Sequence, residues 1–151
     1  LAFASGLWGR VMQENFSTNV CQHTGLASQL ETHELLEMRR VAAKLYKVNK
    51  RYKQSIELSK KDKIYKDVMT TARDSHSTEL AESVLAFFIE MQDKECFTAM
   101  LFTCYDLLKP DYVLEVAWRN GMMDAAMPYV IQSVKQYTGK VDTVTRTSKR
   151  T

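Results

Sequence analysis

Glycine and proline are scarce in this sequence, with only five glycines and two prolines among 151 residues. A protein built from many short strands needs such residues at its turns, so their scarcity favours helices over a sheet. No stretch approaches the roughly 20 apolar residues of a membrane-spanning helix. The apolar start, LAFASGLWGRVM, is short and lacks a basic segment, so we predict no secretory signal peptide. Because the sequence begins with leucine, we expect it to be part of a longer chain.

Cysteines are few, and neither sign of charge is in large excess. Cys96 and Cys104 fall in one expected helix, where a rise of ~1.5 Å per residue separates their Cα atoms by about 12 Å. A disulfide needs less than ~7 Å. With Cys21 they form no CxxC or Cys/His cluster, so we interpret all three as small buried residues in a reduced compartment. The net charge of +3 is too small for a dedicated nucleic-acid binder.

Catalytic motifs are missing as well. The segment from His33 to Glu37 is similar to the HExxH motif of zinc proteases, but Glu37 stands in place of the second histidine ligand. No GxSxG, P-loop or GxGxxG motif occurs. We therefore expect no enzyme activity and no catalytic, metal or cofactor-binding site.

The sequence does contain a series of helical apolar faces, in which apolar residues recur three and four positions apart. The resulting short helices are separated by two to four residues and form hairpins with a period of about 30, which is typical of helical solenoids. We predict an all-α fold, an α-solenoid of short helix hairpins. The expected helices span residues 26–30, 34–48, 52–59, 62–75, 77–91, 93–108 and 110–119, with a last one from 124 onward.

Several residues indicate where these helices begin and end. Asp62 and Ser77 are candidate N-caps, and Asp93 begins the next helix. Pro110 fits the first position of a helix, where its missing N–H has no consequence. Gly121 supplies the left-handed residue that follows the same helix. The apolar positions between these two residues are Val113, Leu114, Ala117 and Trp118.

The last expected helix has a different period. Its apolar residues alternate in steps of four and three, a 3.5-residue repeat that is typical of helices packed on a partner helix. This seam could mediate self-association, or it could fold back as a cap on its own solenoid. Pro128 must lie in the first turn, or it kinks the helix. After Tyr137, glycine and threonines weaken the helical signal. The seam consists of Met123, Met127, Val130, Val134, Tyr137, Val141 and Val144.

Basic residues are concentrated between Arg39 and Lys66, where only Glu57 and Asp62 oppose them. They form either a solvated face of the solenoid or a surface for an acidic protein partner. RNA is a weaker alternative, because the neighbouring tyrosines fall at core-like spacing and not on an exposed stacking surface. The candidate residues are Lys44, Lys47, Lys53, Lys60, Lys61 and Lys63.

Five segments resemble the C-terminal end of clathrin heavy chains. They are LETHELLEMRRVAAKLYK (30–47), KKDKIYKDVM (60–69), TELAESVLAFFIE (78–90), KECFTAMLFTCYDLLKPDYVLEVAW (94–118) and MMDAAMPYVIQ (122–132). The resemblance extends from about residue 26 to 144. Residues 1–22 show no such resemblance and stay unassigned.

The resemblance implies a role in assembly. Residues 23–118 would form the end of the proximal-leg solenoid, and residues 119–151 the longer trimerisation helix and tail. The seam would join three heavy chains into a triskelion hub, and the lysine-rich segment would contribute to the light-chain surface. Neighbouring legs would be further partners, on the cytoplasmic face of coated pits and vesicles. The membrane would be reached only through adaptors, and the tail that recruits the uncoating chaperone is not in this sequence. A monomeric helical-repeat adaptor that binds acidic peptides is the alternative.

Overall fold

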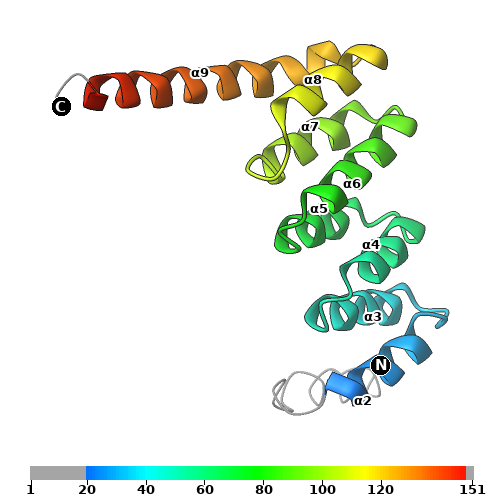
Figure 1. Cartoon of the computed structure of the whole chain (residues 1–151). Coiled ribbons are helices and arrows are strands. Elements are labelled where there is room, and N and C mark those ends of the chain that lie inside the picture. Colours follow the sequence, from blue (N-terminus) through cyan, green and yellow to red (C-terminus); the bar gives the residue numbers. More distant parts are fainter. Residues whose placement is uncertain (1–19, 149–151) are drawn as a thin grey trace. The chain divides into compact units, whose positions relative to one another are not determined.

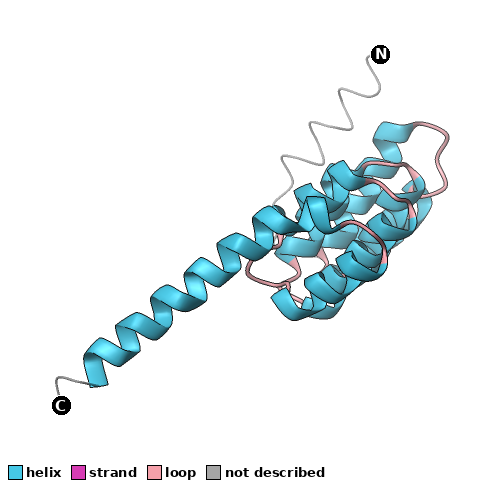
Figure 2. Cartoon of the chain, turned by 90° about the horizontal axis from the view of Figure 1, so that it is seen from above, coloured by secondary structure: helices cyan, strands magenta, loops and turns pink. Residues whose placement is uncertain are grey.

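The computed structural model describes residues 20–148, and side chains from residue 25 onward. Within this range every regular element is an α-helix, as Figure 2 shows, so the all-α prediction is confirmed. Figure 1 labels the helices in chain order. They are α2 (Val20–Leu30), α3 (Leu36–Val48), α4 (Tyr52–Lys61), α5 (Tyr65–Asp74), α6 (Thr78–Glu90), α7 (Lys94–Thr103), α8 (Pro110–Arg119) and α9 (Met123–Ser148).

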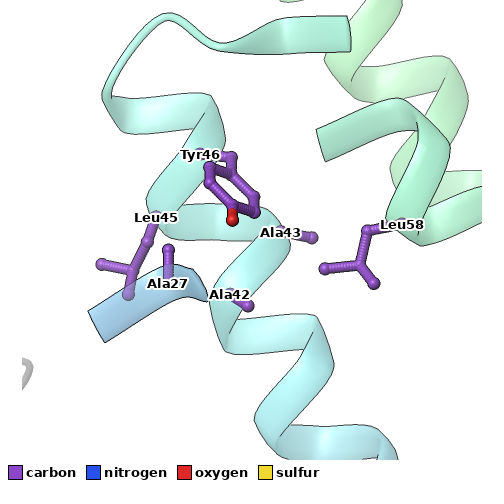
Figure 3. Close-up of a cluster of buried hydrophobic side chains, with 6 residues drawn as sticks. All are labelled: Ala27, Ala42, Ala43, Leu45, Tyr46 and Leu58. Carbon is purple, nitrogen blue, oxygen red and sulfur yellow. The ribbon is translucent and has the colours of Figure 1, made fainter. Parts of the chain in front are cut away.

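The chain divides into two compact units, and the boundary between Leu58 and Ser59 falls inside α4. In the first unit, α2 packs against α3, and Tyr46 donates a hydrogen bond of 2.7 Å to the Glu31 carboxylate. The buried Ser55 hydroxyl donates to the carbonyl of Ala43 at 2.8 Å, which ties α4 to α3. Figure 3 shows a cluster of buried hydrophobic residues in this unit, which consists of Ala27, Ala42, Ala43, Leu45, Tyr46 and Leu58.

The second unit contains the end of α4 and the helices α5 to α9. Along the chain, α5 packs on α6 and α7, α6 packs on α7, and α9 packs on both α7 and α8. Large apolar side chains fill the space between these helices, so each helix contributes one buried face. The largest fully buried residues include Leu85, Phe88, Phe97, Met100, Leu101, Met122 and Tyr129.

Five of the described helices, α3, α4, α5, α6 and α8, end in the same kind of turn. The residue after the C-cap adopts a left-handed conformation at Lys50, Lys63, His76, Gln92 and Gly121, with φ between 51° and 68°. At α8 the N–H of Gly121 bonds to Trp118 and the N–H of Met122 to Ala117, which is the complete Schellman pattern. Only one of these five turns uses glycine, which explains how a chain with few glycines forms so many hairpins.

The helix starts confirm most of the expected signals. The Ser77 hydroxyl accepts from the N–H of Leu80 at 3.5 Å, and the Asp93 carboxylate accepts from the N–H of Cys96 at 3.0 Å. Pro110 is at the start of α8, as predicted. The prediction for Asp62 is wrong, because α4 continues to Lys61 and Ile64 is the N-cap of α5. Asp62 therefore follows the last residue of α4 and precedes the left-handed Lys63.

Several expected helices have different lengths in the structure. The helix expected over 26–30 is α2, which begins at Val20. The helix expected over 93–108 ends at Thr103, and residues 104–107 form turns before α8. Cys104 is therefore the C-cap of α7 and is buried, whereas Cys96 is only half-buried. The last helix does not weaken after Tyr137 but continues as α9 to Ser148.

Candidate functional site

The first part of α9 is firmly attached to the second unit. Met122, just before the helix, and Ala126, Tyr129 and Ser133 within it are buried and follow one another in steps of four, three and four. The Tyr129 hydroxyl donates to the carbonyl of Leu108 at 3.0 Å. Burial in this site raises the pKa of Tyr129. These contacts fix the direction in which α9 leaves the unit.

Tyr105 adds a second link between α9 and the segment before α8. Its ring packs edge-on against the ring of Tyr129, with centroids 5.1 Å apart. Its hydroxyl lies 3.3 Å from the hydroxyl of Ser133, which itself donates to the carbonyl of Tyr129 at 2.9 Å. Because a hydroxyl carries one proton, Tyr105 must be the donor to Ser133.

The predicted seam lies beside this buried face. Its first residue, Met123, and Val130 are half-buried. The other five are exposed by 42% (Met127), 58% (Val134), 57% (Tyr137), 62% (Val141) and 68% (Val144). From Val134 to Ser148 every described residue of α9 is exposed, and Figure 1 shows this part as one continuous helix. A row of large apolar side chains therefore faces solvent over the last four turns.

Other exposed apolar residues of α8 and α9 were not recognised as exposed from the sequence. Ile131 is 48% exposed and lies at the edge of the seam, one position after Val130. In α8 the buried residues are Val113 and Ala117, whereas Leu114 is 41% and Trp118 is 74% exposed. The apolar pattern does not separate these two pairs, and in the structure the small Ala117 is buried whereas the large Trp118 is exposed.

Threonines accompany the seam through the exposed part of α9. Each hydroxyl donates to a main-chain carbonyl three or four residues earlier, as threonine does inside helices. The bonds join Thr138 to Val134 (2.9 Å), Thr143 to Lys140 (2.7 Å), Thr145 to Val141 (2.8 Å) and Thr147 to Thr143 (2.9 Å).

Pro128 lies inside α9 and not in its first turn, so the first of the two alternatives for this residue does not apply. Because proline has no N–H, residue 128 cannot donate to the carbonyl of Asp124, and one helical hydrogen bond is missing there. Tyr129 and Ala126 are anchored on either side of this position, so tertiary contacts hold the helix together.

The candidate lysines lie in both units. Lys44, Lys47 and Lys53 belong to α3 and α4 in the first unit, and of these only Lys47 is half-buried. In the second unit Lys61 and Lys63 are exposed and Lys60 is half-buried. The ammonium of Lys60 lies 4.5 Å from the centroid of the Phe87 ring.

The remaining candidates have structural roles in the described part of the chain. The Nδ1 atom of His33 accepts from the N–H of Leu35 at 3.0 Å, so this histidine stabilises the turn before α3. Among residues 20–148 no group of histidine, cysteine and acidic side chains is arranged to hold a metal. Burial raises the pKa of the Cys104 thiol to about 11. In the same range no helix is long and apolar enough to span a membrane. Cys21 belongs to the residues whose side chains the structure does not describe.

Comparison with known proteins identifies the family. A family described as "Region in Clathrin and VPS" matches residues 13–96, which is more than half of the sequence. The match includes residues 13–22, for which no resemblance was recognised from the sequence. The chain belongs to the clathrin heavy-chain family. Clathrin heavy chain 1 of Arabidopsis thaliana is 58% identical over 118 residues, or 78% of this chain. Clathrin heavy chain of Dictyostelium discoideum and clathrin heavy chain 2 of Homo sapiens are each 56% identical over 117 residues, or 78% of this chain.

This sequence covers 7% of the length of each of these three clathrin heavy chains. The clathrin family has an α-helical solenoid fold, which agrees with the solenoid predicted from the hairpin period.

Proposed function

We propose that this chain is a structural, non-catalytic part of a clathrin coat. In this proposal three copies associate through the α9 seam to form a triskelion hub, with residues 119–151 as the trimerisation region. Residues 23–118 form the end of a leg that contacts neighbouring legs. Lysines of α3, α4 and the turn after α4 bind a clathrin light chain. The coat then acts at the cytoplasmic face of coated pits and vesicles, in vesicle transport.

The exposed seam of α9 is the observation that carries this proposal. Val141 and Val144 are 62% and 68% exposed. Burying a whole valine contributes about 1.5–3 kcal/mol, so covering the exposed part of each contributes roughly 1–2 kcal/mol. A closed trimer contains each contribution three times. In the terminal-cap alternative the same helix would cover its own chain, whereas residues 134–148 are exposed.

Sedimentation or light scattering of the whole chain tests the trimer. We expect a mass of three times the 17.4 kDa chain for the unmodified protein. Val134→Asp combined with Val141→Asp should give a monomer with unchanged helix content. Thr143→Asp is the matched control, because residue 143 lies two positions from Val141 and thus on the opposite side of the helix. A monomer for the unmodified chain across the accessible concentrations would contradict the proposal.

A shortened chain provides a second test. It should end at Gln136, because ending at Arg119 would remove Met122, Ala126 and Tyr129 from the core. We expect the chain ending at Gln136 to keep its fold and to be monomeric. If it still forms a trimer, association depends on other surfaces, and the exposed turns of α9 are not the interface.

The light-chain surface is tested by charge reversal. Replacing Lys60, Lys61 and Lys63 by glutamate should weaken binding of a clathrin light chain and leave the trimer intact. Unchanged binding would remove this segment from the partner surface. A monomeric protein that still binds acidic peptides would favour the helical-repeat adaptor.

A further inference from the structure

Among the lysines of residues 60–66, Lys60 has surroundings that differ from those of Lys61 and Lys63. The ammonium of Lys60, in the last turn of α4, lies 4.5 Å from the ring centroid of Phe87 in α6. This distance is within the range of a cation–π contact, in which the negative face of the ring attracts the charge. Lys61 and Lys63 are exposed, whereas Lys60 and Phe87 are half-buried. Lys60 is thus held by the fold.

The ring of Phe87 is itself fixed by an aromatic cluster. Its centroid lies 5.5 Å from that of Phe88, which is fully buried. Tyr65, the first residue of α5, lies 6.2 Å from Phe87 and packs edge-on to Phe88 at 5.5 Å. Three rings from two helices therefore support the position of one ammonium group.

The local charge indicates what this ammonium could bind. Residues 60–66, KKDKIYK, contain four lysines and one aspartate. An anionic partner is therefore attracted to the segment. Single-stranded RNA would need an exposed ring face for base stacking, but the face of Phe87 is already covered by Lys60. A carboxylate needs only a positioned cation, so an acidic peptide fits the segment better.

We propose that Phe87 is a positioning residue that holds Lys60 ready for a carboxylate of an acidic peptide partner. This inference rests on the proposed binding of an acidic partner by the lysines of α3, α4 and the turn after α4. A lysine already held in place loses less side-chain freedom on binding than an exposed lysine does. Lys60 therefore contributes more to binding than Lys61 or Lys63, although all three carry the same charge.

Fluorescence anisotropy tests this inference with the whole chain and a fluorescein-labelled helical peptide that carries glutamates along one face. Phe87→Leu keeps an apolar side chain but removes the ring, and should weaken binding roughly 2–5-fold, the factor expected for an exposed cation–π contact. Lys60→Gln should weaken binding at least as much. The double variant should be no weaker than Lys60→Gln alone, because Phe87 acts through Lys60.

Lys61→Gln is the matched control, since it removes the same charge from the next residue. Phe87→Leu should retain its full effect in the Lys61→Gln background. Phe87→Tyr keeps the ring face and should bind like the unmodified chain, which separates positioning from a general loss of packing. In NMR spectra of the free protein, the ε-methylene protons of Lys60 should be shifted upfield by the ring, and Phe87→Leu should abolish that shift.

Three results would overturn the inference. Equal effects of Phe87→Leu with and without Lys60 would show that the ring acts independently of this lysine. An unshifted Lys60 signal in the unmodified chain would show that the ammonium is not held in solution. If the unmodified chain does not bind the acidic peptide at all, the proposed partner surface fails together with the inference. If the unmodified chain binds the acidic peptide but Phe87→Leu and Lys60→Gln act independently of each other, the inference fails and the proposed partner surface is unaffected.

Discussion

The hydrogen bond from Tyr129 to the carbonyl of Leu108 provides a direct test of how α9 is anchored. Tyr129→Phe removes the hydroxyl and leaves the ring packed against Tyr105. The bond is 3.0 Å long and buried, so its loss takes a donor away from a carbonyl inside the protein. Leaving such a group without its partner costs about 1–3 kcal/mol. For a chain of this size we expect the melting temperature to fall by roughly 2–4 °C per kcal/mol.

Tyr105→Phe is the matched control, because it removes a hydroxyl from the neighbouring ring. That hydroxyl lies 3.3 Å from the Ser133 hydroxyl in a half-buried position, and Ser133 keeps its own bond to Tyr129. We expect a loss of less than about 1 kcal/mol, since only a longer bond to a still-bonded hydroxyl is removed. Thermal unfolding followed by circular dichroism measures both variants. Equal shifts, or no shift for Tyr129→Phe, would refute the reasoning.

The same tyrosine makes stability depend on pH at the alkaline end. Burial raises the pKa of Tyr129 above its ordinary value of 10.0, so the unfolded chain releases this proton at a lower pH than the folded chain. Between pH 10 and the raised pKa the folded state binds more protons, and stability falls as pH rises. Tyr129→Phe should reduce this fall without abolishing it, because the pKa values of Tyr46 and Tyr112 are raised too. An unchanged slope would contradict this cause.

Further predictions concern turns, caps and thiols. Gly121→Ala should destabilise the protein by about 1–2 kcal/mol, because φ is 68° and only backbone strain opposes the added methyl. Lys50→Gly, at a residue with φ 60°, should not destabilise the protein. A lower melting temperature for Lys50→Gly would contradict the strain argument. Asp93→Ala should lower the free energy of unfolding by about 1 kcal/mol at neutral pH, and Asp93→Asn should lower it much less. Hydrogen bonds from Cys96 lower the pKa of Asp93, so the contribution of its charge should disappear as pH falls below 3.8 in thermal-unfolding series. With a pKa of about 11, only about one Cys104 thiol in a thousand is ionised at pH 8, so alkylation followed by mass spectrometry should detect it only after unfolding.

Helix positions could be predicted from the sequence because apolar spacing, caps and breakers agree over most of the chain. Ser77, Asp93, Pro110 and Gly121 each have the role that their chemistry favours. Asp62 was misassigned because the turn after it uses Lys63 in a left-handed conformation. Sequence reasoning expects glycine at such a position, so nothing marked the true end of α4.

The candidate seam could be predicted only in part. Its period identifies a side of α9 on which five of the seven residues are exposed. Met123 and Val130 are half-buried and the exposed Ile131 was missed, because the edges of the buried face depend on the tertiary packing of α7 and α8. Trp118 shows the same limit. Two pairs of apolar residues in α8 have helical spacing, Val113 with Ala117 and Leu114 with Trp118. The first pair is buried, although Ala117 is much smaller than Trp118. Close approach of two helices favours the smaller side chain, which hydrophobicity alone does not indicate.

The threonine hydroxyls of α9 affect what kind of surface can cover this helix. Thr138 and Thr145 already donate to carbonyls of their own helix, so they need no acceptor from another molecule. A covering helix could bury them without leaving unpaired donors, and a wholly apolar side chain could lie against their methyl groups. Recognition along these turns would then depend on shape and on the spacing of side chains rather than on matched hydrogen bonds. Salt should have little effect on such a contact, whereas lower temperature should weaken it, as expected for hydrophobic association.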